Sequence, residues 1–269
     1  MEFAVQALLL AIIQGLTEFL PVSSSAHLIL PSQVLGWSDQ GQAFDVAVHL
    51  GTLIAVMAYF NKDIRRILTG MWQSLQSRQM NSDMGLGLAV GVGTIPAVVF
   101  GGLFSDFIED NLRSSFVIAC STVVFGLLLW AGDKSGKQLY REDKITLKVG
   151  LMIGMAQALA LIPGTSRSGI TMTAALFMGF NRVAAARFSM LLSIPIILAA
   201  GSLETFKLVS GNEPIAWGFM GLGFLASAIS AFMCIHVFLA LISRMGMLPF
   251  VIYRLLLGGF LFLFVGLGT

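Results

Sequence analysis

The 269-residue sequence has little charge: only 11% of its residues are Asp, Glu, Lys or Arg, whereas a soluble domain has about 25%. This shortage excludes an ordinary soluble globular protein. Because 57% of the residues are hydrophobic and the mean hydropathy is +0.87, we expect an all-α integral membrane protein. The net charge of only +2, with no basic tract and interleaved aromatic residues, argues against nucleic acid as a partner.

Other scarce features narrow the chemistry. The two cysteines, Cys120 and Cys234, both lie in apolar runs, which favours packed helical side chains over a disulfide. No GxGxxG, Walker or Cys/His zinc spacing occurs, so the 29 glycines indicate close helix packing and not nucleotide loops. No cationic stretch precedes the first apolar run, and we therefore expect the N-terminus to be mature structure and not a signal peptide.

The apolar runs predict about six transmembrane helices, since a span needs ~20 residues. They lie at 43–60, 84–104, 115–131, from Arg187 to about Phe206, 215–242 and 247–268. Two further pairs of runs are too short to cross and are broken at prolines, which predicts two re-entrant helix hairpins. These pairs lie at 3–20 with 26–35, and at 149–163 with 168–180.

The distribution of Lys and Arg predicts the orientation. If the loops at 61–83 and 132–148 are cytoplasmic, twelve of the sixteen basic residues lie inside and only Arg113 and Lys207 lie outside. The two hairpins then enter from opposite sides. Residues 1–131 and 149–269 form an inverted-topology repeat within one membrane domain, and their broken helices meet near the midplane.

Polar residues gather at the first break, in the stretch QGLTEFLPVSSSAHL from Gln14 to Leu28. An ionisable group at membrane depth indicates function, and here that group is Glu18. Gln14 lies one helical turn before it, on the same face. A carboxylate with an amide oxygen suits a hard cation, Mg²⁺ or Ca²⁺. The alternative is that Glu18 only pairs with an arginine to hold the fold.

Three serines, Ser23, Ser24 and Ser25, begin the next helix. A helix N-terminus binds anions, although one of these serines could act only as an N-cap. His27 lies three residues beyond Ser24, close enough on a helical turn to exchange a proton with it. A serine beside a base is the usual form of an activated nucleophile. Attack by His27 itself is the alternative.

The second break has the sequence AQALALIPGTSRSGIT, from Ala156 to Thr171. It shares with the first a Pro-x-Ser/Thr-Ser core, at 21–24 and 163–166. Arg167 can make planar, bidentate contacts to phosphate, and glycines let the backbone approach a ligand. The alternative is that Arg167 only neutralises Glu18. The predicted phosphate-binding residues are Ser23, Ser25, Gly164, Thr165, Ser166 and Ser168.

Weaker candidates lie outside the two motifs. Asp45 and His49 are four residues apart on a predicted span and are interpreted equally well as lining the site or as packing between helices. His236 is expected to be a packed or interfacial histidine, and Glu204 an interfacial carboxylate.

One carboxylate, one histidine, several hydroxyls, one arginine and two helix N-termini are typical of phosphoryl transfer. A membrane setting suits a substrate with a long lipid tail. A transporter or flippase of a lipid phosphate is the alternative, because broken helices in inverted repeats are common in transporters. Ser24 with His27 favours the enzyme, since transport needs neither a nucleophile nor a base.

The motifs QGLTEFLPVSSSAH and PGTSRSG, with the DVAVHLGTLIAV region between them, resemble the undecaprenyl-diphosphate phosphatase family, the bacitracin-resistance proteins of bacterial inner membranes. The resemblance covers essentially the whole chain. Gln14 stands where the family has Glu or Gln, and Ala26 replaces a usual glycine.

The resemblance implies hydrolysis of undecaprenyl diphosphate to undecaprenyl phosphate and inorganic phosphate, which recycles the lipid carrier for peptidoglycan synthesis and confers bacitracin resistance. It also implies a multi-pass inner-membrane protein, a divalent cation, Mg²⁺ or Ca²⁺, and a site facing the periplasm; a homodimer is a further expectation. We expect Ser24 to be the nucleophile and His27 the acid/base. Glu18, with Gln14, would hold the cation, and Arg167 the phosphates.

Overall fold

The computed structural model describes residues 2–37, 40–210 and 217–267, and within these ranges every regular element is a helix. The first half contains α1 (Glu2–Thr17), α2 (Ser24–Leu35), α3 (Gln42–Tyr59), α4 (Asn61–Ser77), α5 (Ser82–Asn111) and α6 (Ser115–Ser135). The second half contains α7 (Leu147–Ala158), α8 (Arg167–Phe177), α9 (Arg182–Ser210), α10 (Trp217–Met245) and α11 (Leu248–Leu267). Two short 3-10 helices, η1 (Glu142–Lys144) and η2 (Leu159–Leu161), complete the list.

Five helices are long and apolar enough to cross a membrane: α3, α5, α6, α9 and α10. The apolar part of α11, Leu248–Phe264, is shorter and accounts for the sixth predicted span. The helices α1 and α7 are also too short to cross, as expected of hairpin helices. The prediction of an all-α, multi-pass membrane protein is therefore confirmed. Cys120 and Cys234 are both free thiols, as predicted.

Two predicted loops are largely helical. The segment 61–83 contains α4, and the acidic stretch after residue 104 continues α5 as far as Asn111. The charged residues of segment 61–83 favoured a loop, but α4 is an amphipathic helix. Ile64, Ile67 and Met71 recur at helical spacing on its face turned toward the protein. Asn81 fixes the start of α5 by accepting a hydrogen bond from the Met84 amide.

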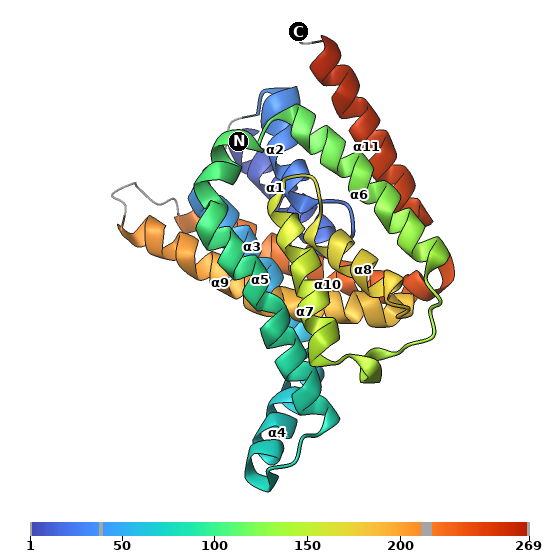
Figure 1. Cartoon of the computed structure of the whole chain (residues 1–269). Coiled ribbons are helices and arrows are strands. Elements are labelled where there is room, and N and C mark those ends of the chain that lie inside the picture. The colour runs from blue at the N-terminus through green and yellow to red at the C-terminus, as the bar shows by residue number, and fades with distance from the viewer. Residues whose placement is uncertain (1, 38–39, 211–216, 268–269) are drawn as a thin grey trace.

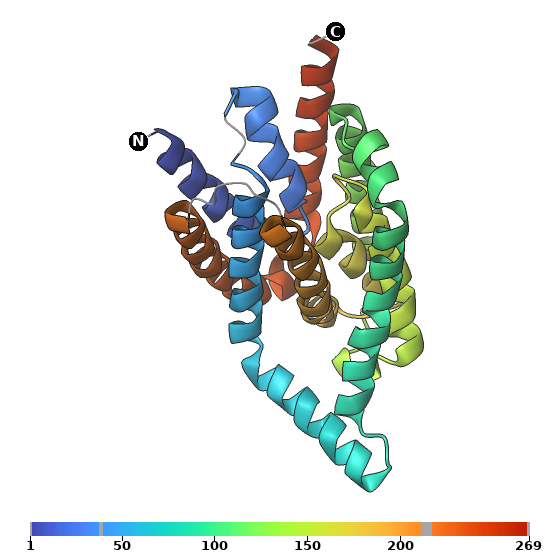
Figure 2. The same ribbon diagram turned by 90° about the vertical axis from the view of Figure 1, so that its left-hand side faces the viewer.

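One helix of each hairpin packs against the other half of the chain, and the helices can be followed in Figures 1 and 2. The helix α1 packs mainly on α10, and α7 mainly on α5. These contacts are close: a Cβ atom on Gly150 would lie 2.4 Å from the Ala89 carbonyl oxygen. The halves therefore interlock, which supports one membrane domain; the inverted repeat remains a prediction.

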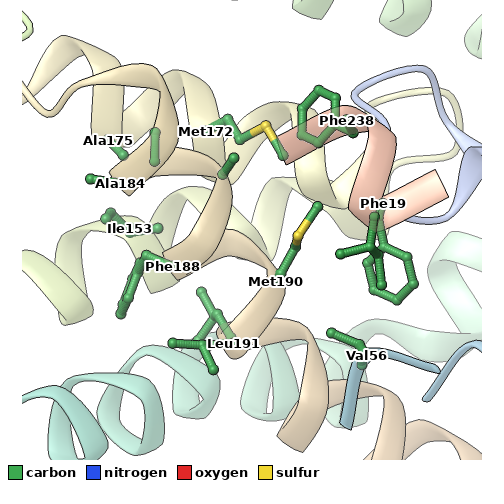
Figure 3. Packing of buried hydrophobic residues seen from close by; sticks show 14 of the residues in the cluster. Phe19, Val56, Ile153, Met172, Ala175, Ala184, Phe188, Met190, Leu191 and Phe238 are labelled. Atoms are coloured by element: carbon green, nitrogen blue, oxygen red, sulfur yellow. The ribbon is translucent and has the colours of Figure 1, made fainter. Parts of the chain in front are cut away.

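One hydrophobic core underlies the predicted site. Its largest share comes from α9, with further residues from α3, α8 and α10, and it includes Phe19, the residue that follows Glu18 (Figure 3). Because Phe19 is fully buried, the turn after α1 cannot move away from α9 without exposing an aromatic ring. The core thus fixes the position of the turn after α1 relative to the second half of the chain.

Candidate active site

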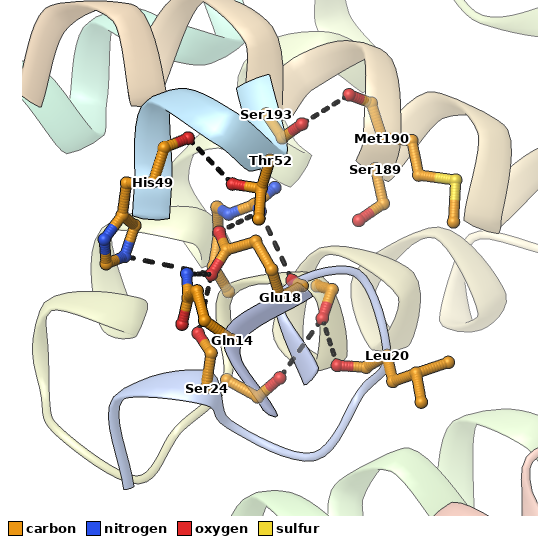
Figure 4. A network of polar contacts seen from close by, with 12 residues as sticks. Gln14, Glu18, Leu20, Ser24, His49, Thr52, Ser189, Met190 and Ser193 are labelled. Carbon is orange, nitrogen blue, oxygen red and sulfur yellow. Dashed lines mark hydrogen bonds and ion pairs between the residues drawn. The ribbon is translucent and has the colours of Figure 1, made fainter. Parts of the chain in front are cut away.

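The Glu18 carboxylate is the centre of a buried polar network directly after α1. Its Oε1 accepts a hydrogen bond from Arg167 Nη2 at 2.8 Å, and its Oε2 accepts one from Ser24 Oγ at 2.7 Å and one from Gln14 Nε2 at 2.9 Å. His49 Nε2 lies 3.9 Å from Oε2. Figure 4 shows Gln14, Ser24 and His49 converging on this carboxylate. The fold therefore brings both motifs together at one acid.

Further bonds join the two broken turns. The Ser168 hydroxyl, in the first turn of α8, donates to the Leu20 carbonyl at 2.7 Å. Ser166 and Ser168 lie within hydrogen-bond distance of each other, at 3.2 Å between hydroxyl oxygens. The Ser168 hydroxyl therefore holds the second turn against the first, and the Ser166 hydroxyl supports it from within the second turn.

A serine in a left-handed conformation precedes each motif helix. Ser23 before α2 has φ 75°, and Ser166 before α8 has φ 69°. Such backbone strain in a residue other than glycine costs about 1–3 kcal/mol and is typical of functional sites. By this conformation Ser23 corresponds to Ser166 and Ser24 to Arg167, one residue away from the register suggested by the shared Pro-x-Ser/Thr-Ser core. The candidate nucleophile and the arginine therefore occupy equivalent positions.

The two helix N-termini differ in their capping. The Ser166 hydroxyl accepts a hydrogen bond from the Gly169 amide and caps α8. Ser23 makes no side-chain cap at α2, and its hydroxyl lies 3.3 Å from that of Ser25. The expectation that one of the three serines caps this helix is therefore not met. Amides of an uncapped helix start can bind an anion.

His27 does not contact Ser24, and here the expected serine–histidine pair is wrong. The His27 Nδ1–H donates to the Ser23 carbonyl at 2.7 Å, and Nε2 is bonded to the Tyr253 hydroxyl, with the two rings stacked. Both ring nitrogens are thus occupied. Their bonds place His27 where it holds the strained Ser23 against α11, while Ser24 has Glu18 as its basic neighbour.

Arg254 is a residue that sequence reasoning missed. It lies in α11 and is fully buried. Within the described part of the chain, no carboxylate forms an ion pair with it. Its guanidinium donates to carbonyl oxygens of both turns and of α6. The acceptors are Pro21 at 3.4 Å, Gly164 at 2.9 Å, Thr165 at 2.9 Å and Thr122 at 3.1 Å. A buried arginine in an apolar helix was the available signal, because such a charge needs partners.

A cavity of about 490 Å³ is lined by the partly buried Arg167 and by the exposed cations Arg113 and Lys207, a size in the usual range for ligand sites. Asp45 and His49 both line it, which favours the site-lining interpretation of that pair. Gln42 and Glu204, which are hydrogen-bonded to each other, also lie along it. His236 instead packs near the ring of Tyr59, as expected of a packed or interfacial histidine.

Several buried polar atoms at this site have no hydrogen-bond partner among the described residues. They are Gln14 Oε1, Gln157 Oε1, Thr165 Oγ1 and Arg167 Nη1. Buried polar groups are normally paired, so a cluster of unpaired ones indicates a ligand. Gln157 also lines the cavity and stands nine residues before Ser166, as Gln14 stands nine before Ser23.

Comparison with known proteins finds relatives over nearly the whole chain. A family model described as bacitracin resistance protein BacA matches residues 7–260. The chain is 60% identical over 253 residues to an undecaprenyl-diphosphatase of Alcanivorax borkumensis, covering 94% of this chain and 96% of the relative. It is 58% identical to one of Aliivibrio salmonicida, over 94% and 95%, and 55% identical to undecaprenyl-diphosphatase 1 of Pseudoalteromonas translucida, over 98% and 99%.

This chain belongs to the BacA family. In this BacA-family protein the structure brings Glu18, Ser24 and Arg167 into direct contact. Ser25 is exposed, and Thr165 presents an unpaired hydroxyl beside Arg254. Gly164 has a packing role: its φ is +88°, and a Cβ atom would lie 2.2 Å from Ser121 Oγ.

Glu18 and Gln14 were predicted to hold a divalent cation. No group of three or more His, Cys, Asp or Glu side chains that could hold a metal occurs in the described part of the chain. The unpaired Gln14 Oε1 and the Glu18 carboxylate nevertheless offer hard oxygen ligands. Mg²⁺ is often held by one or two carboxylates, with waters and substrate phosphates completing its shell. The donor set therefore fits a cation that binds together with a diphosphate.

Proposed function

We propose that this protein hydrolyses undecaprenyl diphosphate to undecaprenyl phosphate and inorganic phosphate. The observation that carries the proposal is the 2.7 Å hydrogen bond from Ser24 Oγ to Glu18 Oε2, since a hydroxyl beside a carboxylate base is an activated nucleophile. The three similar proteins are named for this substrate. The role belongs to the lipid-carrier cycle of peptidoglycan synthesis, and loss of the diphosphate accounts for bacitracin resistance.

In the first step Ser24 Oγ attacks the terminal phosphorus and its proton passes to Glu18. The bond between that phosphorus and the bridging oxygen breaks, and undecaprenyl phosphate leaves. In the second step water attacks the phosphoserine phosphorus, and the phosphate keeps both hydrogens of the water. The Ser24 oxygen leaves and takes back the proton held by Glu18, which restores the site.

The other residues stabilise charge and hold geometry. The unpaired Arg167 Nη1 and the amides at the start of α2 face negative phosphoryl oxygens. His27 and Arg254 are positioning residues, because they hold the turns and not the reacting atoms. A bound Mg²⁺ or Ca²⁺ at Glu18 and Gln14 would supply further neutralisation of the diphosphate.

The positive-inside distribution supports a bacterial inner-membrane protein whose site opens toward the periplasm. The exposed cavity residues Arg113 and Lys207 are the two basic residues assigned to that side. A lipid-phosphate transporter has less support, because transport gives no reason for a serine hydroxyl bonded to a carboxylate.

The test is phosphate release from a polyprenyl diphosphate by purified protein in detergent. Ser24→Ala is compared with Ser25→Ala, a matched control whose exposed hydroxyl lies 3.3 Å from the Ser23 hydroxyl and is not hydrogen-bonded to Glu18. We expect Ser24→Ala to lose about a thousandfold or more and Ser25→Ala less than about tenfold. When the reaction with substrate labelled on the terminal phosphate is quenched with acid, we expect labelled phosphoserine on the wild-type protein and none on Ser24→Ala.

Two results would contradict the proposal. If folded wild type releases no phosphate with Mg²⁺ or with Ca²⁺, the phosphatase hypothesis is wrong and the transporter hypothesis is the better one. If Ser24→Ala keeps full activity, the proposed reaction still holds, but Ser24 is not its nucleophile.

A further inference from the structure

The helix α4 presents an exposed apolar stripe at one end of the molecule. It follows α3 directly through the fully buried Phe60 and projects beyond the other helices (Figure 2). Leu68, Trp72 and Leu75 are 61%, 63% and 64% exposed. Their spacing of four and three residues puts them on one helix face, so the exposure is continuous along two turns.

A different face of α4 is fixed against α5. Asn81 donates from its side chain to the Gly70 carbonyl at 2.9 Å and from its amide to Ser74 Oγ at 3.2 Å. A Cβ atom on Gly70 would lie 2.5 Å from the Cβ of Asp83. The helix therefore cannot rotate to bury Leu68, Trp72 and Leu75, and no described segment of the chain covers them.

Charge borders this stripe on one side. Arg65 lies three residues before Leu68, and Lys62 lies a turn earlier; both are exposed, and neither forms an ion pair with a described residue. Arg66 differs, because it pairs with Asp63 and with Asp83 at 3.1 Å between Nε and Oδ1. Two cations thus remain beside the apolar side chains, on the side of the membrane that holds most basic residues.

We propose that α4 lies in the headgroup layer of the bilayer, with Leu68, Trp72 and Leu75 inserted toward the acyl chains and Lys62 and Arg65 on anionic phospholipid headgroups. Amphipathic helices with tryptophan on the apolar face and basic residues at its border bind in this way. A bilayer is the occupant we commit to because α4 begins two residues after the spanning helix α3 ends. This proposal does not depend on the phosphatase reaction.

The experiment uses the full chain in lipid nanodiscs with Trp72 as the sole tryptophan, after Trp37, Trp130 and Trp217 are replaced by Phe. Lipids brominated near the headgroup quench only indoles in that layer. The matched control carries Trp72→Phe with Gln73→Trp, which moves the indole to the exposed polar side of the same turn. We expect quenching of Trp72 to be about twofold or more stronger than in the control, and stronger with phosphatidylglycerol than with phosphatidylcholine alone.

Replacing Lys62 and Arg65 together by Gln should remove the preference for phosphatidylglycerol while leaving α4 folded, because both side chains are exposed and the bonds that hold α4 to α5 come from other residues. Equal quenching of Trp72 and the control would overturn the proposal. Unquenched Trp72 combined with disulfide cross-linking of Trp72→Cys between two copies would also overturn it, in favour of a protein interface.

Discussion

Replacing Glu18 by Gln separates a catalytic base from a structural ion-pair partner. The amide has the size of the carboxylate and can still contact Ser24, but it cannot take the Ser24 proton. General-base catalysis contributes about 10²–10⁴-fold, so we expect that loss in phosphate release, or about 2.7–5.5 kcal/mol in activation free energy. The same change leaves the Arg167 guanidinium, only 15% exposed, without its carboxylate.

An uncompensated buried charge destabilises a protein by about 3–5 kcal/mol, so Glu18→Gln should also lower the unfolding temperature. The variant Arg167→Met tests that part. In the double variant Glu18→Gln/Arg167→Met both charges are gone, and we expect thermal stability to return toward wild type. Activity should stay lost, because the base and the phosphate-binding arginine are both absent.

The two assays are phosphate release in detergent and thermal unfolding of the same preparations. Recovery of stability without activity supports the double role of the pair. Recovery of activity in the double variant would refute the reasoning, since it would show that Glu18 only neutralises Arg167. Glu18→Gln with more than about half of wild-type activity would refute the base assignment directly.

Four further outcomes are expected. Arg254→Lys should lower both stability and activity, since one ammonium cannot reach carbonyls of two turns and α6 as a guanidinium does; wild-type values in both assays would contradict this. Tyr253→Phe should reduce activity by less than about tenfold, the value of one neutral hydrogen bond, whereas a loss of a thousandfold would make His27 a catalytic group. Gly164→Ala should destabilise by about 1–3 kcal/mol, because its Cβ meets Ser121; unchanged thermal unfolding would count against the packing role. Chelation should abolish phosphate release and added Mg²⁺ or Ca²⁺ should restore it, and activity that survives exhaustive chelation would remove the cation.

The spans were predictable from the sequence because apolar length is a local property. The observed α3 and α6 begin and end within a few residues of the predicted ranges. The prediction failed at α4, where three basic residues in the first turns accompany a helical pattern of apolar ones. Charge content and helix periodicity are independent features, so a charged segment can still form an amphipathic helix.

The grouping of Glu18, Ser24 and Arg167 was also predictable, since each is costly at membrane depth unless it has a partner. Their pairing was not. Sequence spacing put His27 nearest to Ser24, yet the left-handed Ser23 turns the start of α2 so that the Ser24 hydroxyl meets Glu18. The base that Ser24 meets therefore depends on the backbone conformation of this turn, which residue spacing does not specify.

The sequence by itself determined the environment, the helical class and the two broken turns with their polar residues, because hydropathy, proline positions and buried charge act locally along the chain. Only the tertiary structure decided that Arg254 from the last helix holds both turns, that His49 faces Glu18, and that Gln14 and Gln157 are both left with unpaired oxygens. These contacts join segments far apart in the sequence, and their geometry follows from how α1 and α7 pack against the opposite half.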